Sequence, residues 1–98
     1  MSITKKSSIL PWSIENIINS PAGTGVYVLR DATSIERIIY IGSTDNLERR
    51  LKEHFLSKDI PNVLYFDWYE TDGIISARDV EKKWVDKYHP EFNVQDES

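Results

Sequence analysis

The sequence contains no cysteine. This absence excludes disulfide bonds and thiolate metal sites within the chain. Long apolar runs are also missing: no stretch approaches the ~20 residues that a membrane-spanning helix requires, and residues 1–13 are too polar for a secretory signal. We therefore expect an intracellular, cytoplasmic protein with no membrane partner.

A surplus of basic residues is missing as well. The chain has 12 lysines and arginines against 16 aspartates and glutamates, which gives a formal net charge of −4. Proteins that coat nucleic acid without specificity usually carry a positive surplus, so this composition disfavours that class. The basic residues within 49–58 and 82–87 are interspersed with acids. Any contact with a polyanion is therefore expected to be weak and sensitive to salt.

Internal repeats and low-complexity linkers are also absent. We therefore expect one domain over residues 1–98, with flexible ends at 1–8 and 95–98. A chain of this length buries about 60–65% of its unfolded surface on folding. Its hydrophobic content of 40%, with 11% aromatic residues, indicates a packed core. There is room for a small sheet and two or three helices.

The spacing of apolar residues predicts the order of secondary structure. The expected elements are a helix over 14–19, strands over 25–30 and 37–42, a helix over 43–58, a strand over 63–70 and a helix over 77–89. The expected helix N-caps are Ser13, Ser43 or Thr44, and Ser76. Neighbouring strands with helices packed on them predict an α+β fold in the order (α)ββαβα. Its small antiparallel sheet would have about three strands flanked by helices.

The two predicted hairpin strands carry mirrored triplets, Gly-Val-Tyr at 25–27 and Tyr-Ile-Gly at 40–42. If residues 31–36 form the connection, Tyr27 lies directly opposite Tyr40, and the two glycines face each other at the open end. Two phenols would then stand beside a gap that other molecules can approach. The alternative is an aromatic pair that only stabilises the hairpin.

Three charged or titratable side chains lie on helices that would flank this hairpin. Arg50 and His54 are four residues apart on one edge of an apolar helical stripe. Glu81 falls on the apolar face of the last helix, where an unpaired carboxylate is costly. Each also has a purely structural interpretation: a surface arginine, a neutral buried histidine, and an ion pair between Glu81 and Arg50.

Together these residues resemble the GIY-YIG nuclease superfamily. The features that carry the resemblance are the triplets at 25–27 and 40–42 followed by Arg50, His54, Glu81 and Asn93. They extend over residues 25–93. The family includes homing endonucleases, some restriction enzymes and the 3′-incising module of bacterial excision repair. The resemblance implies a small antiparallel sheet flanked by helices, and hydrolysis of DNA phosphodiesters with one divalent metal ion.

The residue types suit this chemistry. Glu81 is a candidate ligand for Mg²⁺ or Mn²⁺, and Arg50 presents a planar fork that matches a phosphate. Tyr27 or Tyr40, with a phenol pKa lowered by Arg50 or by the metal, would orient or deprotonate the attacking water, and His54 would share the proton transfer. By similarity to the family, Tyr27 lies nearest the nucleophile and Tyr40 supports it. Which phenol loses a proton is left open.

Two further residues are expected to support the site. Gly42 leaves room beside the phenols, and Asn93 corresponds to the family's amide that orders the site or contacts backbone. The alternative for Asn93 is a polar cap after the last helix.

The acidic chain shows no second domain that would bind DNA, so a protein partner or a homodimer is expected to supply affinity for DNA. Repair, recombination and mobile-element processing are the candidate processes. The alternative function is a nuclease-like domain that binds nucleic acid or a protein without cutting.

Overall fold

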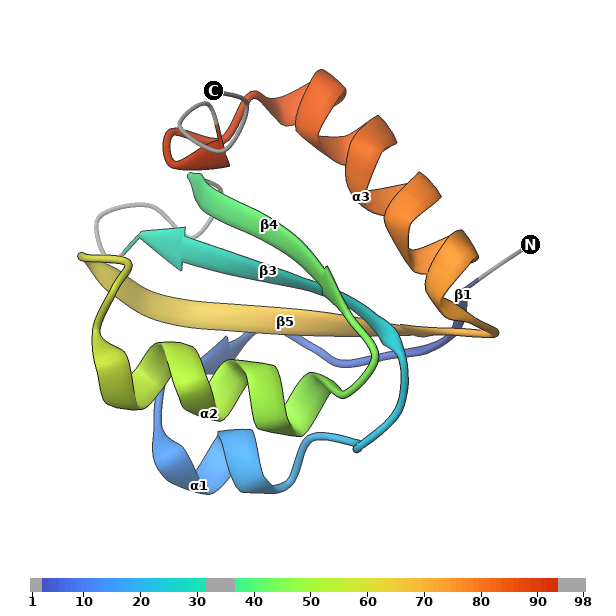
Figure 1. Ribbon diagram of the computed structural model, residues 1–98. Helices are drawn as coiled ribbons and strands as arrows, with labels where there is room; N and C mark the ends of the chain where they lie inside the picture. Colours follow the sequence, from blue (N-terminus) through green and yellow to red (C-terminus); the bar gives the residue numbers. More distant parts are fainter. Residues whose placement is uncertain (1–2, 32–36, 94–98) are drawn as a thin grey trace.

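The central feature of the structure is an antiparallel sheet with helices on both faces (Figure 1). The computed structural model describes residues 3–31 and 37–93. Its elements are β1 (Ile3–Lys6), β2 (Leu10–Pro11), α1 (Ile14–Ile18), β3 (Gly25–Asp31), β4 (Ile38–Thr44), α2 (Leu47–Ser57), β5 (Val63–Thr71) and α3 (Ile74–Tyr88). The predicted α+β class is confirmed, but the sheet has five strands and not about three.

The strand order is β1-β5-β3-β4, and β2 also pairs with β5. The two unforeseen strands come from the N-terminal segment, which we had expected to be flexible over residues 1–8. That expectation is wrong for Ile3–Lys6, which pair with β5 around Thr71 and Tyr69. Strand β1 lies at the edge of the sheet, and main-chain hydrogen bonds hold it there. Most of its side chains are polar and exposed, so its sequence shows no alternation of apolar residues that would predict a strand. Residues 95–98 lie outside the described part of the chain.

The predicted hairpin forms, but its register differs by two residues from the expected one. Tyr27 lies opposite Gly42, and Leu29 lies opposite Tyr40. Arg30 already lies opposite Ile38 where Arg37 is expected, which is a shift of one, and the extra residue Ile39 in β4 adds the second. Because side chains alternate with a period of two, a shift of two keeps Tyr40 on the same face as Tyr27, whereas Ile38, which we expect on that face, packs with Val26 and Val28 on the opposite one. The two phenols are therefore diagonal neighbours on one face, with ring centroids 6.1 Å apart.

Strand β4 is longer than predicted, and this moves the start of the next helix. Ser43 and Thr44 belong to β4, so neither caps α2. The N-cap of α2 is Asn46, whose side chain accepts a hydrogen bond from the backbone N–H of Arg49 at 3.0 Å. The predicted cap of α1 is confirmed, because Ser13 accepts a hydrogen bond from the backbone N–H of Asn16.

The last helix begins earlier than predicted. Helix α3 starts at Ile74 after Gly73, which makes no side-chain capping bond, so Ser76 lies inside the helix and does not cap it. The predicted end before Pro90 is confirmed, since α3 ends at Tyr88. Of the predicted connection 31–36, Asp31 is the last residue of β3 and the remainder lies outside the described residues.

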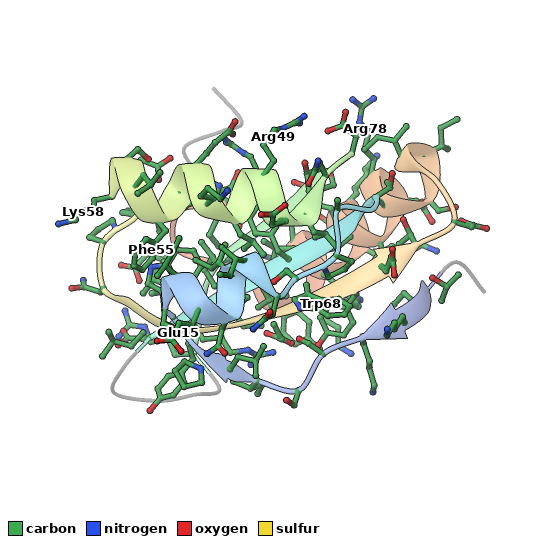
Figure 2. The ribbon with its side chains drawn as sticks, turned by 90° about the horizontal axis from the view of Figure 1, so that it is seen from below. Glu15, Arg49, Phe55, Lys58, Trp68 and Arg78 are labelled. Carbon is green, nitrogen blue, oxygen red and sulfur yellow. The ribbon has the colours of Figure 1, made fainter. Side chains whose placement is uncertain are left out.

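Two apolar clusters lie on opposite faces of the sheet. Helices α1 and α2 cover one face, and α3 covers the other (Figure 1). On the first face Phe55 of α2 turns toward α1 (Figure 2) and meets Trp12 at 5.6 Å between ring centroids. The buried residues of this cluster are Ile17, Tyr27, Leu29, Ile39, Leu47, Leu51, Val63, Phe66 and Trp68. Those beneath α3 are Val26, Val28, Ile41, Ala77 and Val80. Among the described residues, no helix is both long and apolar enough to cross a bilayer.

Candidate active site

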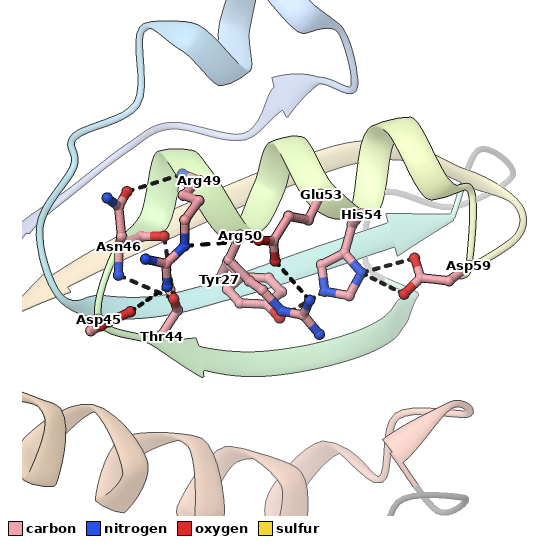
Figure 3. Close-up of polar contacts among 9 residues, drawn as sticks. All are labelled: Tyr27, Thr44, Asp45, Asn46, Arg49, Arg50, Glu53, His54 and Asp59. Carbon is pink, nitrogen blue, oxygen red and sulfur yellow. Dashed lines mark hydrogen bonds and ion pairs between the residues drawn. The ribbon is translucent and has the colours of Figure 1, made fainter.

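Tyr27 is the centre of the polar cluster on β3. Its side chain is only 1% exposed, and its hydroxyl lies 2.8 Å from Nε2 of His54 on α2 (Figure 3). Gly42 lies opposite it on β4. A Cβ atom on Gly42 would lie 2.4 Å from Tyr27 Oη and 2.9 Å from Tyr40 Cε2. Glycine is therefore required at this position for space.

His54 is buried and has a partner at each ring nitrogen. Nε2 contacts Tyr27, and Nδ1 lies 2.9 and 3.0 Å from the two carboxylate oxygens of Asp59. Asp59 follows the C-cap Lys58, which adopts the left-handed conformation with φ of 54° and turns the chain back under the histidine ring. Asp59 was not among the predicted residues. The only available signal was an acid five residues after His54 at a helix end.

Arg50 lies one turn before His54 on α2 and is half-exposed. Its Nη1 donates to Oε1 of Glu53 at 3.0 Å (Figure 3). It also acts on the Tyr27 hydroxyl through hydrogen bonding and charge. The ion pair between Arg50 and Glu81, which was left open above, is not formed by these two described side chains. Arg50 pairs instead with Glu53 of its own helix.

Glu81 approaches from α3, on the other side of β4. Its Oε1 accepts a hydrogen bond from Ser43 Oγ at 2.5 Å. Ser43 comes directly after Gly42, so the two residues point to opposite faces of the strand. The predicted residues are therefore gathered around the edge strand β4: Tyr27 and His54 on the α2 face, and Glu81 on the α3 face. Sequence reasoning treated Ser43 only as a candidate cap and missed this contact.

The pKa of Tyr27 responds to several of these groups. Burial is the largest cause that raises the pKa of Tyr27, and Tyr40 and Glu81 raise it further, while the charge and hydrogen bonding of Arg50 lower it. The net direction is upward, opposite to the lowering expected from Arg50. The residues of the chain thus keep Tyr27 a protonated phenol that can donate its hydroxyl proton.

Access to solvent divides the cluster into two layers. The rings of Tyr27, Tyr40 and His54 lie within 5.4 to 6.1 Å of one another. Tyr27 and His54 are buried, whereas Tyr40, Arg50 and Glu81 are partly exposed. The outer layer is therefore the part of the cluster that a substrate could touch.

Asn93 secures β4 from its outer side. Its Oδ1 accepts a hydrogen bond from the backbone N–H of Ile41, and its Nδ2 donates to the carbonyl of the same residue, each at 2.8 Å. The backbone N–H of Phe92 adds a bond to the carbonyl of Ile39 at 3.0 Å. The buried amide thus imitates a neighbouring strand along an otherwise open edge. This is the backbone contact expected for Asn93, and it orders the strand that carries Tyr40 and Gly42.

The donor set suits a magnesium site with one protein carboxylate. Within residues 3–31 and 37–93, no group of three histidine, aspartate or glutamate side chains is placed to hold a metal ion. Glu81 is partly exposed and carries the hard oxygen donors that such an ion prefers. Mg²⁺ is commonly held by one or two carboxylates, with waters and phosphate oxygens completing its octahedron. The residues present therefore fit a divalent cation that shares its coordination with a substrate phosphate.

The outer face of α2 offers little net positive charge. Arg49 projects from the helix surface (Figure 2) but pairs with Asp45 at 2.6 Å and with Glu53 at 3.9 Å. Lys52 pairs with Glu48 at 3.4 Å. Acids of α2 and of the residues just before it thus compensate the cations nearest the site, and weak affinity for polyanions stays a prediction.

The sequence matches a known protein family. The family model of the GIY-YIG catalytic domain matches residues 23–95. The UvrABC system protein C of Corynebacterium jeikeium (strain K411) is 31% identical over 83 residues, which cover 76% of this chain and 12% of that protein. The protein of the same name from Mycoplasmopsis agalactiae (strain NCTC 10123 / CIP 59.7 / PG2) is 32% identical over 84 residues, 78% of this chain and 14% of the relative. The chain thus spans a small part of the length of these relatives.

Solved structures share the fold. The GIY-YIG N-terminal endonuclease domain of UvrC from Thermotoga maritima, as a point mutant bound to its catalytic divalent cation, superposes with a TM-score of 0.68 at 21% identity. That alignment covers 79% of this chain and 89% of the other. The same domain bound to magnesium gives a TM-score of 0.61 at 21% identity, with coverage of 79% and 90%. At these identities the likeness establishes a common architecture.

Proposed function

Because the chain belongs to the GIY-YIG catalytic domain family, we propose that it is a metal-dependent endonuclease that hydrolyses DNA phosphodiester bonds in a repair process. The observation that carries the proposal is the convergence of two phenols, a guanidinium, an imidazole and a carboxylate around one edge strand. The similarity to UvrABC system protein C supports repair over recombination and mobile-element processing.

Glu81 is the residue that would hold the divalent cation, Mg²⁺ or Mn²⁺. When bound, such an ion supplies Lewis-acid stabilisation of the charge that develops on the phosphoryl oxygens. Ser43 fixes the orientation of the carboxylate through its hydrogen bond to Oε1. The solved UvrC endonuclease domains carry a catalytic divalent cation, magnesium in one case, which supports the choice of metal class.

Arg50 is the phosphate-binding residue in this proposal. Its guanidinium stays charged at any working pH and can donate two parallel hydrogen bonds to a phosphate. In the substrate-free protein one of its nitrogens contacts Glu53. Both side chains are well exposed, so this ion pair is weak and a phosphate can displace it.

The two phenols take different roles. We propose that Tyr40, the more exposed one, orients the attacking water. Tyr27 lies beneath it, remains protonated and shares a hydrogen bond with His54, while its oxygen faces Arg50. This reverses the order expected from the family resemblance, and the burial of Tyr27 is the reason for the reversal.

The chain by itself is expected to bind DNA with low affinity. The compensated charges of α2 and the net charge of −4 support a need for further binding surface. A protein partner, a homodimer or additional domains are the candidates, because the relatives are much longer than this chain. An intracellular location without a membrane partner also stays a prediction.

The test is a cleavage assay with nicked, branched and duplex DNA in Mg²⁺ or Mn²⁺. Wild-type protein and Glu15→Gln are expected to cut at least one substrate, and Glu81→Gln and Arg50→Ala are expected to lose the activity. Glu15 is an exposed acid in the first turn of α1, so Glu15→Gln makes the same chemical change as Glu81→Gln on another element. If the wild type cuts no substrate, or Glu81→Gln cuts equally well, the proposal fails and a binding domain without nuclease activity is favoured.

A further inference from the structure

The contact between Asp59 and His54 lies behind the cluster, on the side away from Tyr27. The left-handed Lys58 ends α2 and places the Asp59 carboxylate against Nδ1, with both oxygens within 3.0 Å. The imidazole is 3% exposed, whereas the carboxylate is 47% exposed. Asp59 therefore touches the site only through the buried ring of His54.

We propose that Asp59 is a positioning residue that fixes His54 in the tautomer with its proton on Nδ1. The Nε2 atom of the ring is then the acceptor for the Tyr27 hydroxyl. Asp59 thus sets the direction of the hydrogen bond that orients Tyr27.

The argument rests on which atoms carry protons. An ionised carboxylate has no proton to donate, so the hydrogen bond to Asp59 requires a proton on Nδ1. In a neutral imidazole the other nitrogen is then an acceptor, and Tyr27 must donate to it. The hydroxyl proton is thereby directed toward His54, and the oxygen lone pairs are directed away from the ring, where Arg50 acts on the phenol.

The electrostatics of Asp59 agree with this arrangement. Burial acts to raise the pKa of Asp59, but the hydrogen bonds that its carboxylate accepts from the His54 ring and from Ser57 act in the opposite direction, and the net direction is below its ordinary value. Asp59 is therefore an acceptor at neutral pH. A carboxylate that orients a functional histidine in this way is a recurrent device in enzymes.

The first experiment detects the tautomer directly and needs no activity. Two-bond ¹H–¹⁵N NMR of uniformly labelled protein distinguishes a protonated ring nitrogen from an unprotonated one. We expect the wild type to show the proton of His54 on Nδ1, and Asp59→Ala to shift the two nitrogen resonances toward each other as the second tautomer becomes populated. His89, the other of the two histidines, is exposed and serves as an internal reference.

Two further variants make the result decisive. Asp72→Asn is the control, because it makes the same chemical change at the end of β5 that lies away from Asp59. The strand between the two ends is roughly 30 Å long at about 3.3 Å per residue. This variant must leave the His54 spectrum unchanged. Asp59→Asn keeps the shape of the side chain and must also populate the second tautomer, so the test stands if Asp59→Ala fails to fold. A wild-type proton on Nε2, or spectra of both Asp59 variants identical to wild type, would overturn the assignment.

The catalytic consequence rests on the proposed function and is measured separately. In the cleavage assay Asp59→Ala is expected to lower kcat by about 10- to 100-fold, the usual loss when the partner of a functional histidine is removed, with little change in KM. Equal kcat for wild type and Asp59→Ala would overturn the catalytic role. If the wild type shows the predicted tautomer but cuts no DNA, the nuclease proposal fails and the tautomer assignment holds.

Discussion

Gly42 offers the sharpest test of how the site is packed. A methyl group at this position would lie 2.4 Å from Tyr27 Oη and 2.5 Å from Cζ, well inside contact distance. No described glycine has a positive φ, so Gly42 is needed for the space above the phenol and not for an unusual backbone conformation. Gly42→Ala must therefore displace the Tyr27 ring or bend β4.

The expected cost follows from the burial of the displaced ring. Tyr27 is 1% exposed and is held by His54, so its phenol has little room to retreat. Overpacking of this kind destabilises a protein by about 1–3 kcal/mol. For a domain of this size each kcal/mol lowers Tm by about 4–8 °C, so the loss is roughly 5–20 °C. Because Tyr27 moves, the cleavage rate should fall even at temperatures where the variant is folded.

The assay is urea denaturation combined with thermal melting, with Gly73→Ala as the matched control. A Cβ atom on Gly73 would meet no atom within 4 Å, so the same substitution there should cost less than about 1 kcal/mol, the usual range for a helix N-cap. We expect the urea midpoint of Gly42→Ala to fall with an unchanged m-value. A Gly42→Ala protein as stable as Gly73→Ala would refute the close approach of the phenol.

Three other substitutions test separate parts of the site. Asn93→Leu removes both buried hydrogen bonds to β4 and should lower the free energy of unfolding, measured by urea denaturation, by about 1–3 kcal/mol. A variant as stable as the wild type would contradict the role of Asn93 in holding that strand. Ser43→Ala frees the Glu81 carboxylate and should raise the Mg²⁺ concentration needed for half-maximal cleavage; an unchanged titration curve would show that the hydrogen bond has no part in metal binding. Glu53→Gln releases Arg50 from its ion pair and should raise the affinity for DNA at low salt, measured by the fluorescence anisotropy of a labelled DNA. The gain should disappear at high salt, where the charges are screened. Equal affinity of variant and wild type at low salt would show that the ion pair does not compete with phosphate.

The sequence predicted the architecture because most elements are strongly patterned. The β-branched and aromatic residues of β3, the alternation of side chains along β5 and the apolar stripe of α2 identified strands and helix without reference to the remainder of the fold. Strand β1 escaped because its polar side chains are exposed and its stability comes from main-chain pairing with β5. The extra residue at Ile39 escaped because a bulge depends on how two strands meet and leaves no mark on either strand alone.

The sequence could predict which candidate residues lie together but not the contacts they make. Tyr27, Tyr40 and His54 could be assigned from the family motif, and their rings do come together. The partners Ser43 and Asp59 could not be assigned, because each became a partner only when the backbone brought it to its neighbour. Asp59 depends on the left-handed turn at the end of α2, and sequence periodicity does not report such a turn.

Burial separates the cluster into an inner and an outer layer. Burial raises the pKa of Tyr27, so the side chains around it favour the protonated phenol at the centre of the cluster. This burial holds the Tyr27 phenol in one orientation. Its hydroxyl contacts His54, and its ring occupies the space that a side chain at position 42 would need. Tyr40 is the more exposed of the two phenols, which is why the proposed function assigns the attacking water to it. Because Asn93 anchors the strand that carries Tyr40, the exposed half of the site keeps its geometry at the edge of the sheet.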